Sequence, residues 1–224
     1  MILGGSEMKI CTILLIALHI KMLYVPTYSY ADIAQPTDIR EGQIVCIPIY
    51  LDQQDIDIIG IDITIHYSSL FLVFSKISLR GGFLEREYSL TIGNQITDEI
   101  SLGIYATGGI RKGTGSIAKL YFICKGNHND QGNISIKKFL VNDLYAKGGL
   151  VWKNFCSTQL DFAVKKCTLA DVINGLQILI GFQSITNWVD MNGNEWPGID
   201  DVLQLIIKSA IIKSESLYDK QKDY

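Results

Sequence analysis

The chain has 224 residues, of which 48% are hydrophobic and 19% are charged. This is an ordinary globular composition with room for one large domain and one small one. The formal net charge is −3, which excludes the strongly basic surface typical of nucleic-acid-binding proteins.

Residues 1–31 have the features of a secretory signal peptide. Lys9 precedes the apolar run Ile10–Leu18, and residues 29–31 (SYA) form a small-x-small cleavage site. A spanning helix needs about 20 continuous apolar residues, and His19 and Lys21 interrupt this run. We expect a secreted or cell-surface protein with no membrane contact beyond the export signal; a retained anchor is the alternative.

The mature chain would keep four cysteines: Cys46, Cys124, Cys156 and Cys167. Four cysteines permit three disulfide connectivities, and all three stay open. A Cys156–Cys167 pair would stiffen the passage between the two predicted modules. Cys46 and Cys124 lie in apolar strand patterns, where buried free thiols are equally compatible with the sequence. There is no CxxC motif, so a zinc site is not expected.

Residues 32–162 carry the pattern of an all-β domain. Ile61, Ile63 and Ile65 alternate with polar residues, as in a half-buried strand, and the alternation returns over Ile100–Ile104. Further strands are predicted at Ile44–Leu51, Phe71–Ser75, Ser116–Cys124 and Asn133–Val141. Many short strands separated by Gly-rich turns predict a jelly-roll β-sandwich.

No pattern of catalytic residues is present in this domain. His66 and His128 are isolated, and Glu85 and Glu87 flank Arg86 in a polar turn that reads as a charged loop. No serine occupies a nucleophile elbow, and no Gly-rich loop has phosphate-binding spacing. We therefore predict that the protein is not an enzyme.

Four aromatic residues could stack on sugar rings: Tyr88, Tyr105, Tyr145 and Trp152. They fall on different predicted strands, and tyrosine is a favoured strand residue in any case. The pattern favours packing within the sandwich over a flat sugar-binding row. Direct polysaccharide binding by the sandwich is the alternative.

Residues 167–210 contain two amphipathic helical patterns. The first apolar stripe consists of Leu169, Val172, Ile173, Leu176, Leu179 and Ile180, and the second of Ile199, Val202, Leu203, Ile206, Ile207 and Ala210. The two halves echo each other, because LADV at 169–172 matches IDDV at 199–202. Thr168 with Asp171 reads as an N-cap and its acidic partner.

The loop between the helical patterns has the ligand spacing of an EF-hand calcium site. Its candidate ligands are Asp190, Asn192, Asn194, Trp196 through its carbonyl, Gly198 through a water, and Asp201. Position 6 is Glu195 where glycine is usual, and Pro197 follows at position 8. We expect one weak Ca²⁺ site, with a Kd of roughly 0.1–1 mM. The alternative is a polar turn that only links two helices.

The C-terminal region resembles a dockerin, the calcium-binding module of cellulosome-type assemblies. The motifs that carry the resemblance are DMNGN, IDDVLQLI and the earlier half-repeat TLADVINGLQILIG. The residues before Asp171 lack the carboxylates of a first calcium loop. The resemblance therefore implies a degenerate module over residues 163–213 with one calcium site, followed by a charged tail over 214–224.

The preceding domain is similar to a cohesin. EGQIVCIPIYL, IIGIDITIHYSSLFLVFSKI, GTGSIAKLYFICKG and NISIKKFLVNDLYAKGG follow that family's pattern in order, including Gly60, Asp62, Ile65 and Tyr67. Ser68-Ser69 stands where the family usually has Asp-Pro. The resemblance implies a cohesin-like jelly-roll sandwich over residues 32–162, related to carbohydrate-binding modules.

Together the two resemblances imply a secreted, non-catalytic assembly protein. Its partners would be complementary cohesin or dockerin modules on other secreted proteins, linked to extracellular polysaccharide degradation. The candidate partner-binding residues are Trp188, Trp196, Val202 and Ile206. Alternatives are direct carbohydrate binding, or a helical pair that packs on its own sandwich as an appendage. A linker of only Gln159–Lys166 favours a separate partner over binding within one chain.

Overall fold

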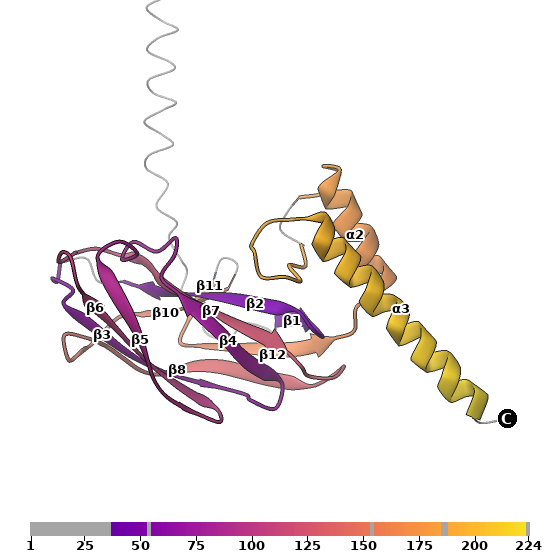
Figure 1. Ribbon diagram of the computed structural model, residues 1–224, viewed down its shortest axis with the longest axis horizontal. Helices are drawn as coiled ribbons and strands as arrows, with labels where there is room; N and C mark the ends of the chain where they lie inside the picture. Colours follow the sequence, from indigo (N-terminus) through magenta and orange to yellow (C-terminus); the bar gives the residue numbers. More distant parts are fainter. Residues whose placement is uncertain (1–36, 53–54, 153–154, 185–187, 223–224) are drawn as a thin grey trace, which may run out of the picture.

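The computed structural model describes residues 37–52, 55–152, 155–184 and 188–222, with the side chains of 94–96 and 212–222 left undescribed. Two β-sheets pack face to face, and two helices lie together at one end of this sandwich (Figure 1). The predicted fold class, a mainly β jelly-roll-type sandwich with a small C-terminal helical pair, is confirmed. The expected signal peptide lies outside the described residues.

The larger sheet has seven strands in the order β1-β12-β8-β3-β6-β5, with β9 paired to β8. Its strands are β1 (Thr37–Arg40), β3 (Gly60–Tyr67), β5 (Tyr88–Ile96), β6 (Glu99–Ala106), β8 (Gln131–Val141), β9 (Leu144–Tyr145) and β12 (Gln159–Lys165). The first and last of these strands, β1 and β12, pair in parallel, whereas the other pairs are antiparallel.

The smaller sheet has five strands in the order β11-β10-β2-β7-β4. They are β2 (Ile44–Leu51), β4 (Leu72–Ser78), β7 (Gly115–Cys124), β10 (Gly148–Trp152) and β11 (Phe155–Ser157). The chain passes from β1 in one sheet to β2 in the other through the turn at residues 41–43.

The core lies between the two sheets and follows the predicted alternation. Ile61, Ile63 and Ile65 on β3 are buried, as are Val45, Ile47, Ile49 and Leu51 on β2. Phe122 on β7 sits among aromatic rings, 5.2 Å from Tyr67 and 5.8 Å from Phe74 between ring centroids. Every second side chain of a strand points inward, so the hydrophobic period sets the register of both sheets.

Strand β12 corrects the predicted boundary between the modules. Residues 159–166 were expected to be a linker, but Leu160, Phe162 and Val164 alternate into the core, and the strand ends only at Lys165. The sandwich therefore extends three residues beyond the predicted end at residue 162. Residues 166–168 alone connect it to the first helix.

The two helices are α2 (Leu169–Leu179) and α3 (Ile199–Lys222). The predicted cap is confirmed as a capping box: the Thr168 side chain accepts from the Asp171 backbone, and Asp171 accepts from the Thr168 backbone. Helix α3 continues through most of the segment predicted as a charged tail, which corrects that boundary. None of the helices in the described part of the chain is long and apolar enough to cross a bilayer.

The aromatic cluster around Phe122 predicts a large loss of stability on truncation. Phe122→Ala should lower the free energy of unfolding by about 3–5 kcal/mol, because it removes a fully buried ring and leaves a cavity. Urea unfolding followed by circular dichroism measures this change. Ile123→Ala, on the same strand but facing outward, is the matched control and should cost less than about 1 kcal/mol. Equal losses would contradict the described orientation of β7.

Candidate functional site

The two helices pack closely because one of them presents a glycine. A Cβ atom on Gly175 of α2 would lie 3.1 Å from Cγ2 of Val202 on α3 and 3.4 Å from the Trp188 ring. Val172 and Ile178 complete the buried side of α2, and Leu205 joins Val202 on α3. The repeat is therefore structural as well as sequential, since Val172 and Val202 occupy equivalent positions and both are buried.

Most residues of the two predicted apolar stripes are exposed. On α2, Leu169, Ile173, Leu176, Leu179 and Ile180 face solvent, as do Ile199, Leu203, Ile206 and Ile207 on α3. Only Val172 and Val202 of the two stripes are fully buried. Helices of the predicted length are marginal in isolation, so the sequence predicts that the two stripes pack on each other. Instead, each helix is apolar over a wide arc, and only one edge of that arc meets the other helix. We call the exposed residues of both helices the helix stripes.

The four predicted partner-binding residues differ in accessibility. Val202 is 0% exposed, which corrects its assignment to a partner surface. Trp196 is 73% exposed and Ile206 is also exposed, so both can meet a partner. Trp188 is half-buried against Gly175 and faces the junction between the modules.

The loop from Asp190 to Asp201 has turns stabilised by its own side-chain oxygens. The Asp190 carboxylate accepts from the backbone N–H groups of Gly193 (2.7 Å) and Glu195 (2.8 Å). Asn192 accepts from the N–H of Asn194 at 2.9 Å, and Asn194 accepts from that of Trp196 at 2.8 Å. Three of the four predicted side-chain ligands, Asp190, Asn192 and Asn194, therefore accept backbone hydrogen bonds within one loop. The fourth, Asp201, comes from the start of α3.

Asp201 is a fully buried carboxylate at this loop. Its Oδ1 accepts from the N–H of Met191 at 2.9 Å and of Asn192 at 3.2 Å, and its Oδ2 accepts from that of Gly198 at 3.1 Å. Burial raises the pKa of Asp201; the N–H groups of Met191 and Asn192 oppose this rise, and the charge of Asp190 adds to it. Two carboxylates close together in a partly buried site are the arrangement that a cation stabilises.

The donor set fits a hard, oxygen-preferring cation. Each carboxylate oxygen has lone pairs beyond those used by the backbone N–H groups. The side-chain oxygens of Asn192 and Asn194 add two neutral metal ligands. Within the described residues no cluster of three or more His, Cys, Asp or Glu side chains has metal-binding geometry. Any metal at this loop would therefore depend on the asparagine and backbone oxygens as well as on Asp190 and Asp201.

Position 6 of the loop has the left-handed backbone usual for glycine. Glu195 has φ +68°, which costs a non-glycine residue about 1–2 kcal/mol. Its carboxylate accepts from Lys119 Nζ on β7 at 2.7 Å to each oxygen and from the Cys46 thiol on β2 at 3.0 Å. A glycine could make neither contact, so the glutamate offsets the backbone strain by tying the loop to the sandwich.

Two further contacts bring the loop against β2. The N–H of Ile44 donates to the carbonyl of Met191 at 3.1 Å. Gly193 has φ +73°, and a Cβ there would lie only 2.5 Å from the Ile44 side chain. The loop therefore approaches the sandwich with its backbone. The sequence left open that the helical pair packs on its own sandwich but did not identify the loop as the contact; the glutamate in place of the usual glycine was the available signal.

An ion pair joins the sandwich to the first half of the helical repeat. Arg40 Nη2 on β1 donates to Asp171 Oδ1 on α2 at 2.7 Å. Burial would raise the pKa of Asp171, but hydrogen bonds from Arg40 and Thr168 outweigh this effect and hold the pKa below its usual value. Asp171 is equivalent to Asp201 in the repeat, so the half that lacks calcium ligands has an arginine beside its carboxylate.

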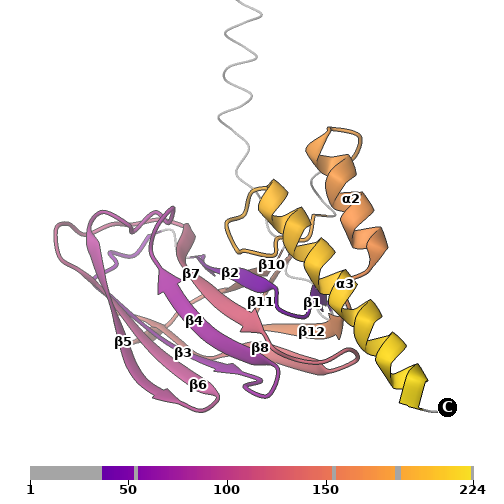
Figure 2. The same cartoon turned by 45° about the vertical axis from the view of Figure 1, so that its right-hand side comes forward.

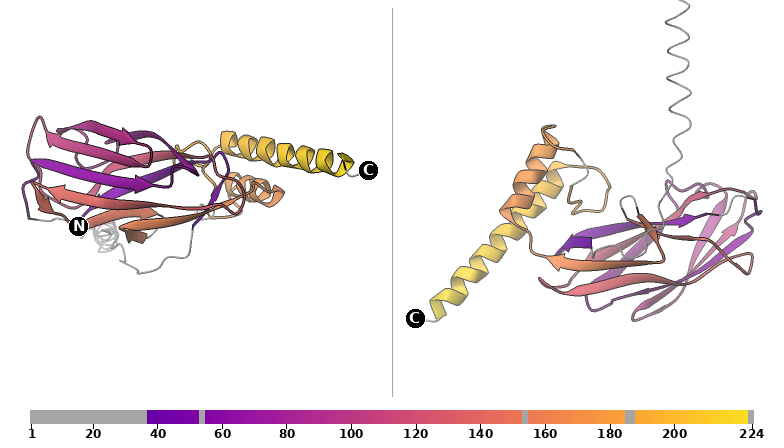
Figure 3. Two further views of the ribbon diagram at one scale, coloured as in Figure 1. Left: turned by 90° about the horizontal axis from the view of Figure 1, so that it is seen from below. Right: turned by 180° about the vertical axis from the view of Figure 1, so that it is seen from behind.

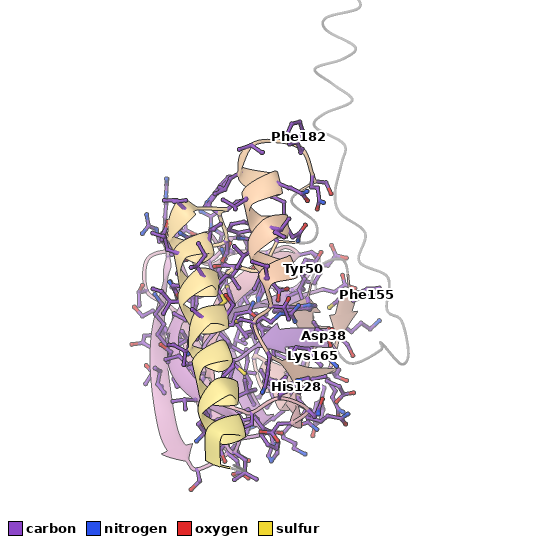
Figure 4. All side chains as sticks on the ribbon, turned by 90° about the vertical axis from the view of Figure 1, so that its right-hand side faces the viewer. Asp38, Tyr50, His128, Phe155, Lys165 and Phe182 are labelled. Atoms are coloured by element: carbon purple, nitrogen blue, oxygen red, sulfur yellow. The ribbon has the colours of Figure 1, made fainter. Side chains whose placement is uncertain are left out.

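A cleft of about 450 Å³ lies at this junction. Asp38 and Arg40 line it from β1, Trp152 from β10, Asp171 and Asn174 from α2, and Trp188 from the loop that follows. Figure 4 views the molecule from this end and labels Asp38 and Lys165 near the strands beneath α2. The view turned by 45° in Figure 2 shows the same end of the sandwich, with α2 above β1 and β12 and α3 running diagonally past them.

The aromatic candidates of the sandwich have different surroundings. Tyr88 is buried, and its hydroxyl donates to the Ile58 carbonyl and accepts from the Arg111 N–H at 2.9 Å. Trp152 is half-buried and packs edge-to-face on Phe162, with ring centroids 5.7 Å apart. Tyr105 and Tyr145 are exposed on the larger sheet.

The isolated charged residues have local partners. His66 Nε2 lies 3.4 Å from the Asp98 carboxylate. Glu87 accepts two hydrogen bonds from the Arg111 guanidinium. The prediction that Glu85 and Glu87 belong to a charged loop agrees with this ion pair.

No disulfide is formed among Cys46, Cys124, Cys156 and Cys167, which all lie within the described residues. The Cys156–Cys167 pair considered from the sequence is not formed. Burial first, and then the Glu195 carboxylate, raise the pKa of Cys46 to about 12. Burial likewise raises the pKa of Cys167 to about 11. Both thiols are therefore poor nucleophiles at neutral pH.

Comparison with known proteins gives cohesin modules as structural neighbours. No protein-family model and no curated protein matches the sequence. A non-cellulosomal cohesin from the archaeon Archaeoglobus fulgidus is 15% identical, covering 58% of this chain and 87% of that one, with a TM-score of 0.42. A cohesin module of a Clostridium perfringens family 33 glycoside hydrolase is 10% identical, covering 62% and 98%, with a TM-score of 0.44.

A third neighbour is the sixth cohesin of Acetivibrio cellulolyticus scaffoldin B, solved in complex with a Cel5 dockerin. It is 14% identical, covers 58% of this chain and 95% of its own, and has a TM-score of 0.42. At these low values, function has to be derived from the residues of this chain.

The Arg40–Asp171 pair predicts a pH-dependent contribution to stability. Asp171→Asn should lower the free energy of unfolding by about 1–2 kcal/mol at pH 7. The folded pKa of Asp171 is depressed, so its contribution is present above the unfolded pKa of about 3.9 and is lost as the pH falls through the folded pKa.

Urea unfolding from pH 7 to pH 3 would measure this difference. The gap between wild type and Asp171→Asn should close towards the acid end. Asp161→Asn, which removes an exposed carboxylate that accepts only from Gln159, is the control and should show no such gap. A gap that is constant with pH would contradict the ion-pair origin.

Proposed function

We propose that this protein is a secreted, non-catalytic assembly protein whose helix stripes bind a cohesin-type β-sandwich on another protein. The observation that carries the proposal is the exposure of the stripes. Leu169 is 68% exposed and Ile199, its counterpart in the repeat, is 59% exposed. Soluble monomers rarely leave apolar surface of this extent uncovered. The dockerin resemblance of the sequence supplies the class of partner.

The docking of the helical pair leaves this surface available. The pair meets its own sandwich through the calcium-type loop, Glu195 and the Arg40–Asp171 ion pair, which involve β1, β2 and β7. Figure 3 shows the helices extending from the end of the sandwich. One side of the helical pair is thus attached to its own sandwich, and the other side keeps an uncovered apolar surface.

The sandwich has a second surface for assembly. The outer face of β8, β3, β6 and β5 is separate from the described contacts of the helical pair (Figure 1). The cohesin resemblance of the sequence makes this face the proposed acceptor for a dockerin-type helical module. Export and a role in extracellular polysaccharide degradation belong to the same proposal and rest on residues 1–31 and on the two resemblances.

A second candidate is direct polysaccharide binding by the outer face of the sandwich. Tyr145 lies opposite Leu140, which lies opposite Asp62, and Tyr105 lies opposite Gly60. Both tyrosines therefore share one face and are 86% and 47% exposed. Two separated rings present less exposed apolar surface than the uncovered helix stripes do, so assembly is the favoured function.

Partner binding should depend on the helix stripes. Leu176→Asp and Leu203→Asp should each weaken partner binding at least about tenfold, because each places a charge in an apolar contact. The immobilised whole protein would be exposed to culture supernatant, and bound proteins would be identified by mass spectrometry.

Leu70→Asp changes a leucine on the sandwich that is more exposed than Leu176 and Leu203; it is the control and should bind as wild type does. Light scattering would detect self-association instead. A strictly monomeric protein that captures no protein with a cohesin-type domain would leave only the appendage role.

We also propose that the loop binds one Ca²⁺ ion through Asp190, Asn192, Asn194, Trp196, Gly198 and Asp201. Calorimetry on the whole protein should give a Kd of roughly 0.1–1 mM, because only two of the side-chain ligands are charged. Asp190→Ala should abolish the heat of binding, whereas Asp55→Ala, an exposed carboxylate away from the loop, should not. Absence of heat for wild type at millimolar calcium would exclude the site.

A further inference from the structure

The cleft between the sandwich and α2 contains an unusual group of unpaired donors. Arg40 Nε, Trp152 Nε1 and Trp188 Nε1 are buried and have no hydrogen-bond acceptor, and all three residues line this cleft. Buried N–H groups normally have a partner, and tryptophan in particular tends to place its N–H against one. Of the five buried unpaired side-chain atoms in the described residues, three therefore belong to one cleft.

From this arrangement we propose that the cleft is a binding site for a short neutral saccharide. The volume of about 450 Å³ lies within the roughly 300–1,000 Å³ of small-molecule sites. The unpaired groups are all donors, so the ligand must supply acceptor oxygens. The site does not depend on partner binding by the helix stripes.

The charges in the cleft favour a neutral ligand over an anion. Arg40 contributes one positive charge, and Asp38 and Asp171 contribute two negative charges, which gives a net charge of −1 for these three residues. Arg40 is already paired with Asp171 at 2.7 Å, so its charge is not free to hold an anion. Lys165 is 3.9 Å from Asp38 and only balances that carboxylate.

Sugar hydroxyls match both sets of groups. A hydroxyl accepts from an indole or guanidinium N–H and donates to a carboxylate such as Asp38. The indole rings of Trp152 and Trp188 come from different modules, and each offers an apolar surface for the C–H face of a sugar ring. The three N–H groups are shielded in this structure, so a saccharide that accepts from them would have to displace these side chains.

The cleft lies between the two modules, so a bound ligand would also affect how firmly the modules are held together. Trp152 and Arg40 belong to the sandwich, whereas Asn174 and Trp188 belong to the helical module. A ligand in the cleft would contact both and would stabilise their docked arrangement by mass action.

The test is calorimetry on the whole protein with cellobiose, maltose and N,N′-diacetylchitobiose, and with acetate as an anionic probe. With each ligand at about 10 mM, at least one disaccharide should give a heat of binding with a Kd near 1 mM. Acetate should give none. Trp188→Phe and Trp152→Phe keep a ring but remove the donor, so each should weaken binding by about tenfold. Asp38→Asn, on an exposed position of β1, should weaken it as well.

Thermal unfolding without ligand separates loss of a contact from loss of the fold. Each Trp→Phe change removes an unpaired buried donor, which favours the fold, but also leaves a small cavity beside a packed ring, so the unliganded Tm should change by only a few degrees. Tyr145→Ala is the control, since it removes the most exposed ring of the sandwich surface and leaves the cleft intact. Binding that is lost in Tyr145→Ala but kept in Trp188→Phe, binding of acetate alone, or no binding by any disaccharide would overturn the proposal.

Discussion

The ion pair between Arg40 and Asp171 is the contact on which the two-module arrangement depends. Arg40 is the last residue of the first described strand, and its backbone N–H donates to Gln43 Oε1, so its position is fixed by the turn into β2. Its guanidinium then reaches the capping residue of α2. A charge-assisted hydrogen bond of this kind is among the stronger polar contacts in proteins. It places the start of α2 and the cleft relative to one edge of the sandwich.

The two halves of the helical repeat have kept their packing and diverged in their polar contacts. Val172 and Val202 are both buried, whereas Leu169, Ile173 and Leu176 are exposed, as are their counterparts Ile199, Leu203 and Ile206. The carboxylates differ: Asp201 accepts three backbone N–H groups of the loop, whereas Asp171 accepts from an arginine of the sandwich. In the first half of the repeat, this aspartate therefore attaches the helical pair to the sandwich.

The sequence predicted the sandwich well because alternation is a local property. Strand β2 was placed at its observed limits, and β3 and β6 were found from isoleucines at every second position. Strand β1 was missed because it has only four residues. Strand β12 was missed because residues 159–166 were assigned to a linker, although Leu160, Phe162 and Val164 alternate. The docking of Glu195 on Lys119 and the cleft beneath α2 join residues more than 70 positions apart, so no local pattern could reveal them.

The prediction that the apolar stripes of the two helices face each other failed for a related reason. Periodicity in the sequence identifies the apolar face of a helix, but it does not show what covers that face.

The parallel pairing of β1 with β12 has a mechanical consequence. Thr37 lies opposite Phe162 and Arg40 lies opposite Lys165, so tension applied along the chain through Thr37 and Lys165 pulls the two strands past each other in opposite directions. In this shear geometry all the inter-strand hydrogen bonds are loaded together, whereas a peeling geometry would break them one at a time. The sandwich can therefore resist stretching through a four-residue ladder at the same edge to which the helical pair is attached.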